Sequence, residues 1–320
     1  MSSPPVQSAR LSASSLVLLA GIALTWGCNW PALKVALGEI PIATLRAICL
    51  LGGGVAFLLF ARIGGERLRL PARGEWGPLL LVTACNIVAW HLGTAVGVML
   101  LPAGRSSILA FTMPIWAALF DRVLFGSRLG LARTLGFALG GLGIAVLLLP
   151  DLAALLSAPL GVLAMLGAAV GWALGSLLMK RVRWRIPPQQ LTAWQLLLGG
   201  LPFAAGALAI DPLARLAAVH APTWAIVAYI VALPMVFAYW AWFKLLSRLP
   251  SSVAAISTLC VPVVGLLSSA VLLHEAIGLQ EVAALVLVGC GVALVLLVPA
   301  PVPPSPAAVS AAPSPRRRAA

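Results

Sequence analysis

Charged side chains are scarce in this sequence. Only 9% of its 320 residues are Asp, Glu, Lys or Arg, whereas 62% are hydrophobic; a soluble domain carries roughly 25% charged residues. A water-soluble fold could not hide so much apolar surface, and a disordered chain would need far lower hydrophobicity. Apolar segments continue to about residue 298, which excludes a single-pass anchor. The composition indicates an all-α polytopic membrane protein.

Acidic residues are the rarest charged type, with 8 Asp and Glu against 21 Lys and Arg. None lies in the middle of an apolar segment, so we expect no buried carboxylate relay of the kind found in many proton-driven pumps. No phosphate-binding loop motif is present, so we expect no coupling to ATP. The net charge of +13 is attributed to loops that set membrane orientation, and we expect no nucleic-acid partner.

The cysteines form no disulfide or metal-binding pattern. All five lie in apolar segments and none has C-x-x-C spacing, at Cys28, Cys49, Cys85, Cys260 and Cys290. They are expected to pack as small apolar residues. We therefore expect no metal, no cofactor and no catalytic residue.

A helix needs about 20 apolar residues to cross a bilayer, and the sequence predicts ten such helices. Two of them are completed only by including Arg46 and Arg105, so each carries an arginine near one end. The expected helices cover residues 14–37, 41–61, 77–98, 103–121, 131–149, 159–180, 189–210, 223–244, 251–273 and 279–298.

The basic residues predict how these helices are oriented. With residues 1–13 in the cytoplasm, most Lys and Arg residues fall in inside segments, whereas the outside loops hold only Arg215. This is the positive-inside pattern. Residues 299–320 are rich in proline and end in an arginine cluster, which predicts a disordered cytoplasmic tail. Because the composition is typical of a GC-rich bacterium, we expect a bacterial inner (plasma) membrane protein with both termini cytoplasmic.

The chain repeats itself at an offset of 146–148 residues. The matches include Trp26 with Trp172, Lys34 with Lys180, Leu101-Pro102 with Leu249-Pro250, and Pro114 with Pro262. Each repeat, 14–149 and 159–298, holds five predicted helices, and this odd number places the second repeat upside down in the membrane. Inverted repeats are an architecture of secondary transporters, which alternate between two packings that open to opposite faces.

The same residues resemble a known family. Trp26–Pro31 is similar to its W-G-(S/C)-N-(W/F) opening, Leu45-Arg46 to its L-R pair, Ser107–Trp116 to its fourth-helix signature, and His274-Glu275 to its closing G-E pattern. The family is the EamA-type branch of the drug/metabolite transporter superfamily. The resemblance covers residues 14–298 and implies export of amino acids, metabolites or toxic compounds. Ser127 departs from the pattern, which has Glu there.

The first helix carries a candidate substrate site. Trp26, Asn29 and Trp30 are spaced i, i+3, i+4, which places them on one helix face. Asn29 would lie about 12 Å from the outer helix end, too deep for an interfacial aromatic belt. We interpret these residues as the amide and aromatic walls of a cavity. The alternative is that Asn29 bonds to a neighbouring helix.

Further site candidates lie on later helices. Asn86 and Trp90 have i, i+4 spacing, and His91 lies clearly within a predicted span. His91 could change charge during transport, but the more frequent role is a neutral ring bonded to a backbone carbonyl. The remaining candidates are Trp172, the repeat partner of Trp26, and Tyr239, the repeat partner of His91, with the adjacent Trp240.

Three cations lie within predicted helices, at Lys34, Arg46 and Arg105. All are expected near the outer surface, where long side chains extend to water, and Arg46 could pair with Glu39. The alternative is an outer vestibule that attracts substrate carboxylates.

Two prolines, Pro114 and Pro262, occupy matching positions in the fourth and ninth helices. Proline interrupts a helix, and matched interruptions in both repeats point to a hinge beside the binding region. The alternative is simple kinked packing.

Several alternatives stay open at this point. Coupling could use His91, or the protein could be a facilitator driven by the substrate gradient. An intramembrane enzyme and a membrane scaffold are rival functions, although the sequence has no G-x-S-x-G motif that would favour an enzyme. The expected partners are a small-molecule substrate and the lipid bilayer, and either a monomer or a homodimer is compatible with the sequence.

Overall fold

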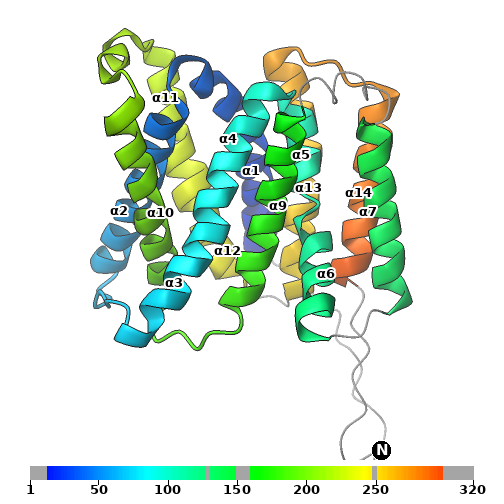
Figure 1. The fold of residues 1–320 in the computed structure, drawn as a ribbon, viewed down its shortest axis with the longest axis horizontal. Coiled ribbons are helices and arrows are strands. Elements are labelled where there is room, and N and C mark those ends of the chain that lie inside the picture. Colours follow the sequence, from blue (N-terminus) through cyan, green and yellow to red (C-terminus); the bar gives the residue numbers. More distant parts are fainter. Residues whose placement is uncertain (1–12, 127–129, 149–158, 247–250, 298–320) are drawn as a thin grey trace, which may run out of the picture.

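The computed structural model describes residues 13–126, 130–148, 159–246 and 251–297. All regular secondary structure in these residues is helical. The helices stand side by side in one bundle (Figure 1). Residues 1–12, Ser127 and the tail 299–320 lie outside the described residues.

The first part of the bundle follows the predicted order of apolar segments. Its elements are α1 (Ala13–Glu39), α2 (Ile42–Ile63), η1 (Arg73–Glu75), α3 (Trp76–Thr83), η2 (Ala84–Ala89), α4 (Trp90–Leu100), α5 (Ala103–Ala110), α6 (Met113–Phe125) and α7 (Leu131–Leu148). Elements η1 to α4 follow one another without a gap.

The second part has a parallel order. Its elements are α9 (Leu160–Met179), α10 (Pro188–Ile210), η4 (Leu213–Ala218), α11 (Ala221–Ile230), η5 (Val231–Phe237), α12 (Ala238–Leu246), α13 (Ser251–Leu273) and α14 (Leu279–Leu297).

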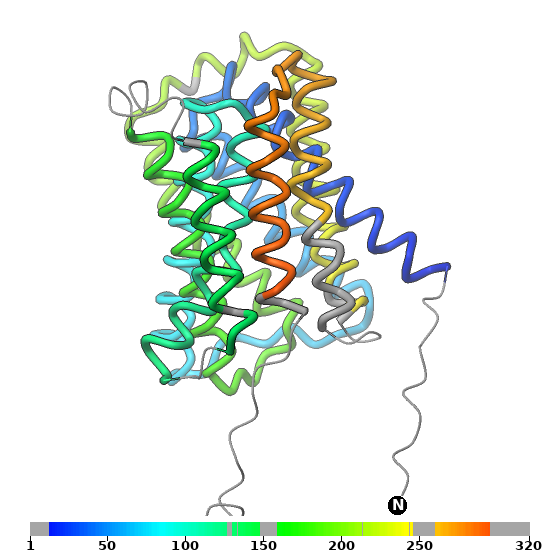
Figure 2. Tube along the Cα trace, turned by 90° about the vertical axis from the view of Figure 1, so that its right-hand side faces the viewer, coloured from blue at the N-terminus to red at the C-terminus, as the bar shows by residue number. Residues whose placement is uncertain are grey.

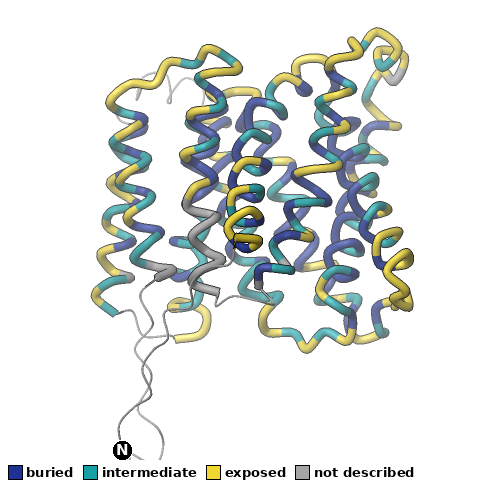
Figure 3. Tube along the Cα trace, turned by 180° about the vertical axis from the view of Figure 1, so that it is seen from behind, coloured by how far each residue is buried: buried dark blue, intermediate teal, exposed yellow. Residues whose placement is uncertain are grey.

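The outward-facing surface of the bundle is apolar. Within the described residues, seven helical segments are long and apolar enough to cross a membrane, and shorter apolar helices cover Thr134–Leu147, Cys260–Leu273 and Leu279–Leu294. Large hydrophobic side chains such as Phe60 and Val271 are exposed, and exposed positions follow the outer faces of the helices (Figure 3). Such surfaces suit lipid rather than water, so the chain is a polytopic helical membrane protein.

Helices α2 and α10 pack against each other in antiparallel directions. Thr44, the third residue of α2, donates from its hydroxyl to Asp211, the first residue after α10 (2.7 Å). At the other end of the pair, Gln190 near the start of α10 donates to Glu66 beyond α2 (3.1 Å). Each helix therefore begins where the other ends.

Helices α7 and α14 form a second antiparallel pair. Gln280, at the start of α14, donates from its amide to the carbonyl of Leu147, at the end of α7 (2.6 Å). Figure 2 shows the two helices running alongside each other. Because α2 and α10 are the second α-helices of the two parts, and α7 and α14 the last, both pairs join corresponding elements.

Each part contains a π-helix at a corresponding position, η2 in the first and η5 in the second. Their first residues, Ala84 and Val231, are separated by the offset of the sequence repeat. A π-turn leaves backbone groups outside the regular ladder and is frequent at functional sites. Here the η5 carbonyl of Pro234 accepts a hydrogen bond from the indole of Trp26 (3.1 Å).

The matched prolines have different local effects. Pro114 is the second residue of α6, directly after a turn at Phe111 and Thr112 that separates α5 from α6. Pro262 lies inside α13, which continues through it. The structure thus breaks the helix at one proline and not at the other, and the role of either as a hinge stays a prediction.

Candidate substrate cavity

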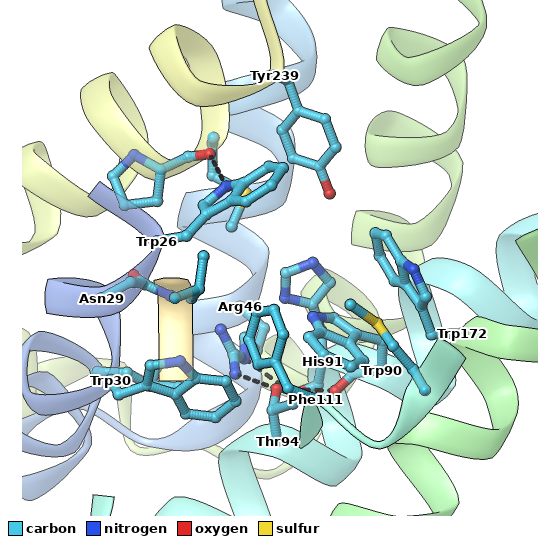
Figure 4. A pocket seen from close by; sticks show the side chains of 15 residues that line it. Trp26, Asn29, Trp30, Arg46, Trp90, His91, Thr94, Phe111, Trp172 and Tyr239 are labelled. Atoms are coloured by element: carbon cyan, nitrogen blue, oxygen red, sulfur yellow. Dashed lines mark hydrogen bonds between the residues drawn. The ribbon is translucent and has the colours of Figure 1, made fainter. Parts of the chain in front are cut away.

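A cavity of about 90 Å³ lies between helices of both parts of the chain. This volume is below the roughly 300–1,000 Å³ of pockets that hold drug-sized ligands, so the cavity suits a small solute. The fifteen lining residues are Trp26, Asn29, Trp30, Leu33, Arg46, Trp90, His91, Thr94, Phe111, Met113, Trp172, Pro234, Met235, Tyr239 and Val261 (Figure 4).

Most of the site residues singled out from the sequence meet in this cavity. They are Trp26, Asn29, Trp30, Trp90, His91, Trp172 and Tyr239. Asn86 and Trp240 are not among the lining residues. Asn86 is buried against α9, where a Cβ on Gly175 would collide with its amide oxygen. Trp240 is 38% exposed, and its ring lies 4.4 Å from the ammonium of Lys244.

Aromatic pairs join the two parts of the chain across the cavity walls. Trp26 and Tyr239 meet edge to face with ring centroids 5.7 Å apart, and Trp90 and Trp172 are 4.9 Å apart. Such pairs bury much apolar surface and fix ring orientation. The cavity therefore has rigid aromatic walls on both sides.

Arg46 lies deeper than the sequence suggested. Its side chain lines the cavity and only 1% of the residue is exposed. The guanidinium donates from Nε to the carbonyl of His91 and from Nη2 to the hydroxyl of Thr94, both at 2.9 Å. The expected pairing with Glu39 is wrong, because that carboxylate accepts hydrogen bonds from Thr223 and His220.

Several polar atoms at the cavity have no hydrogen-bond partner among the described residues. They are the Oδ1 atom of Asn29 and both ring nitrogens of His91. The backbone-bonded imidazole considered from the sequence is therefore wrong for this structure. Buried polar atoms without partners are costly, so a hydrogen bond to any of these three atoms would be favourable.

Lys34 and Arg105 lie outside the cavity and join helix ends. Lys34 pairs with Glu275 (3.2 Å), whose carboxylate also accepts hydrogen bonds from the backbone N–H groups of Ala103 and Gly104 at the start of α5. Arg105 pairs with Glu281 (2.8 Å). In this structure both cations therefore serve contacts between helix ends, and neither lines the cavity.

The substitution Glu275→Gln should destabilise the protein, because the amide cannot accept from all three donors and loses the charge that favours a helix N-terminus. We expect a loss of about 1.5–3 kcal/mol, the range for hydrogen bonds to charged groups. Thermal unfolding in detergent measures it. The control Asp121→Asn breaks a more exposed pair with Arg181 (3.4 Å), which should contribute about 0–1 kcal/mol. Equal melting temperatures for Glu275→Gln and the wild type would contradict the assignment.

Sequence reasoning missed some lining residues that had a recognisable signal. Thr94 follows Trp90 by four positions and His91 by three, so it shares their helix face. Phe111 and Met113 lie three positions and one position before Pro114, a predicted hinge residue. Val261 and Met235 carried no such signal, because they are ordinary apolar residues in apolar helices.

An internal cavity walled by both parts of a multi-pass helical bundle is typical of membrane transporters. The chain belongs to the EamA-like transporter family, whose model matches residues 13–149 and again residues 159–297. It is thus a membrane transporter built from two copies of this family's domain.

Curated relatives agree with this assignment, and a solved structure shares the fold. The uncharacterized transporter YvbV of Bacillus subtilis is 29% identical over 85% of this chain and 88% of its own. A probable amino-acid metabolite efflux pump of Escherichia coli is 27% identical over 85% of this chain and 91% of its own. One crystal structure shares the fold with a TM-score of 0.62, at 22% identity, covering 90% of this chain and 98% of its own.

Proposed function

We propose that the protein is a secondary transporter that exports small metabolites, amino acids or related compounds, across a bacterial inner membrane. Its ten spans form two inverted five-helix repeats with both termini in the cytoplasm, and the shared cavity is exposed to each face in turn. The observation that carries the proposal is that one small cavity is lined by corresponding helices of both repeats. The E. coli relative, described as a probable amino-acid metabolite efflux pump, supports the direction and the solute class.

Paired contacts at the two faces support the inversion. Thr44 is the third residue of α2, and Gln190 is the third residue of α10. Each donates a hydrogen bond to a carboxylate that lies beyond the end of the other helix. A repeat in the same orientation would place these contacts on one face. Their position at opposite ends of an antiparallel pair is what a two-fold axis in the membrane plane produces.

A second pair of contacts obeys the same relation. Thr223, the third residue of α11, donates to Glu39 (2.7 Å), and Glu39 lies three residues before α2 begins. Glu75, the third residue of η1, accepts from the backbone N–H of Arg185 (2.6 Å), which lies three residues before α10 begins. The same two positions of the repeat are therefore in contact twice. The third residue of the later element donates in one contact, as Thr223, and accepts in the other, as Glu75. A pairwise equivalence of this kind allows the halves to exchange roles during transport.

Reconstitution in liposomes tests the proposal. Purified protein should release preloaded radiolabelled amino acids or related solutes unaltered, whereas an enzyme would yield a new chemical species. Asn29→Ala removes a cavity-lining amide and should lower the initial rate at least tenfold. Asn86→Ala removes the same group outside the cavity and should leave the rate per folded protein within about twofold. No flux of any solute, or equal losses in both variants, would contradict the proposed site.

A further inference from the structure

The cavity wall contains a buried cation, Arg46, that pairs with no carboxylate of the described residues. Arg46 is almost fully buried, and its hydrogen bonds go to a backbone carbonyl and a hydroxyl. No carboxylate of the described residues forms an ion pair with it. A guanidinium remains charged at any physiological pH. The wall of the cavity therefore carries a permanent positive charge.

The uncompensated charge is not required for helix packing at this position. The corresponding turn of α10, which packs against α2 as its antiparallel partner, carries the neutral residues Thr192 and Ala193. Both are buried, with 9% of Thr192 and 0% of Ala193 exposed. An uncharged turn therefore suffices for packing between α2 and α10, and the cost of burying a cation points to a role for Arg46 at the cavity.

The guanidinium of Arg46 has hydrogen-bond donors left for an anion. Its hydrogen bonds to the described residues use only Nε and Nη2, whereas a guanidinium has five N–H donors. The imidazole of His91 has no partner on either ring nitrogen. Figure 4 shows Arg46, His91 and Thr94 gathered on one side of the cavity, with Trp30 and Phe111 beside them.

We propose that Arg46 binds the carboxylate of the transported solute, with His91 as a second polar contact and the aromatic side chains enclosing the apolar remainder. The substrate class is thus a small organic carboxylate, which includes the carboxylate end of an amino acid. This inference rests on the proposed transport function. A carboxylate fits because its two oxygens can accept parallel hydrogen bonds from a guanidinium.

Two probes of equal size isolate the charge: phenylacetate and its neutral counterpart phenylacetamide. Binding to the full-length protein in detergent is followed by tryptophan fluorescence and by thermal stabilisation. The wild type should bind phenylacetate at least tenfold more tightly than phenylacetamide. Arg46→Gln should abolish this preference, and Arg46→Lys should keep part of it because the charge remains. Arg105→Gln, which removes an arginine outside the cavity, should leave the preference intact.

The outcomes separate this inference from the proposed function. Equal wild-type affinities for the two probes, or no binding of phenylacetate, would overturn the carboxylate site. So would an unchanged preference in folded Arg46→Gln. If the same preparation still releases solute from liposomes, the proposed transport function remains supported although the carboxylate site is wrong. If the wild type prefers phenylacetate and yet moves no solute, the binding site stands and the transport function fails.

Discussion

The substitution Met113→Trp should abolish transport while the protein still folds. Met113 lines a cavity of about 90 Å³, and the larger indole at this position fills the space that a solute must occupy. Because Met113 is only partly buried and follows the turn between α5 and α6, the backbone can accommodate the larger side chain. We expect at least a tenfold loss in the initial rate of solute release from liposomes, with an unchanged elution profile in detergent.

Met99→Trp provides the matched control. Met99 lies on α4 but is 52% exposed on the outer surface of the bundle, where tryptophan is compatible with lipid. This variant should transport at the wild-type rate. Normal transport by folded Met113→Trp would show that solutes do not pass through the cavity.

The substitution Gly93→Val should prevent stable assembly of the bundle. Helices α4 and α9 approach so closely that a Cβ at position 93 would lie 2.5 Å from the carbonyl oxygen of Ala164 and 2.9 Å from Cβ of Ala168. A backbone oxygen cannot move aside as a flexible side chain can, so the helices must separate. Overpacking of this kind costs about 3 kcal/mol or more. We expect little monodisperse protein and a strongly lowered melting temperature.

The control Gly167→Val distinguishes the loss of the close contact at Gly93 from the general effect of placing valine in a glycine-rich helix. Gly167 lies on α9, the same helix that Gly93 contacts, and a Cβ there would meet nothing within 4 Å. The control should behave as the wild type in size-exclusion chromatography and thermal unfolding. Comparable instability in both variants would contradict a specific crossing of α4 and α9.

Hydropathy placed several helices closely, because charges and prolines bound most of the apolar stretches. The helix ends observed for α2, α10 and α14 lie within a few residues of the predicted ranges. The local irregularities were beyond such reasoning. Neither π-helix has a signal in the pattern of apolar residues, since a lipid-facing or buried helix is apolar all round and its period is hard to detect.

Asn86 and Trp90 share a face toward α9, as their i, i+4 spacing predicts, but only Trp90 lines the cavity. Asn86 lies within η2 (Ala84–Ala89), about one turn before Trp90, where it packs against Gly175 of α9. A shared helix face therefore does not by itself place both residues at the cavity. Adjacent residues on α12 give a simpler case. Tyr239 lines the cavity and Trp240 is partly exposed, because neighbouring helical positions point in different directions.

The position of Arg46 follows from a contact that the sequence does not reveal. Its distance from the start of α2 was predicted well, since the helix begins at Ile42. Hydropathy then favours an arginine that extends toward water. The structure instead turns the side chain toward α4, where a carbonyl and a hydroxyl accept its hydrogen bonds. Burial of a charge depends on these tertiary partners, which lie more than forty residues away along the chain.

Single-cysteine labelling tests the inverted arrangement most directly. In a variant with the five native cysteines replaced, one cysteine is placed at Gly65, after α2, or at Pro212, after α10. A membrane-impermeant maleimide applied to intact cells without an outer membrane should label position 212 at once. Position 65 should be labelled only after the membrane is permeabilised. Labelling of both positions from the same side would contradict two oppositely oriented repeats around one cavity.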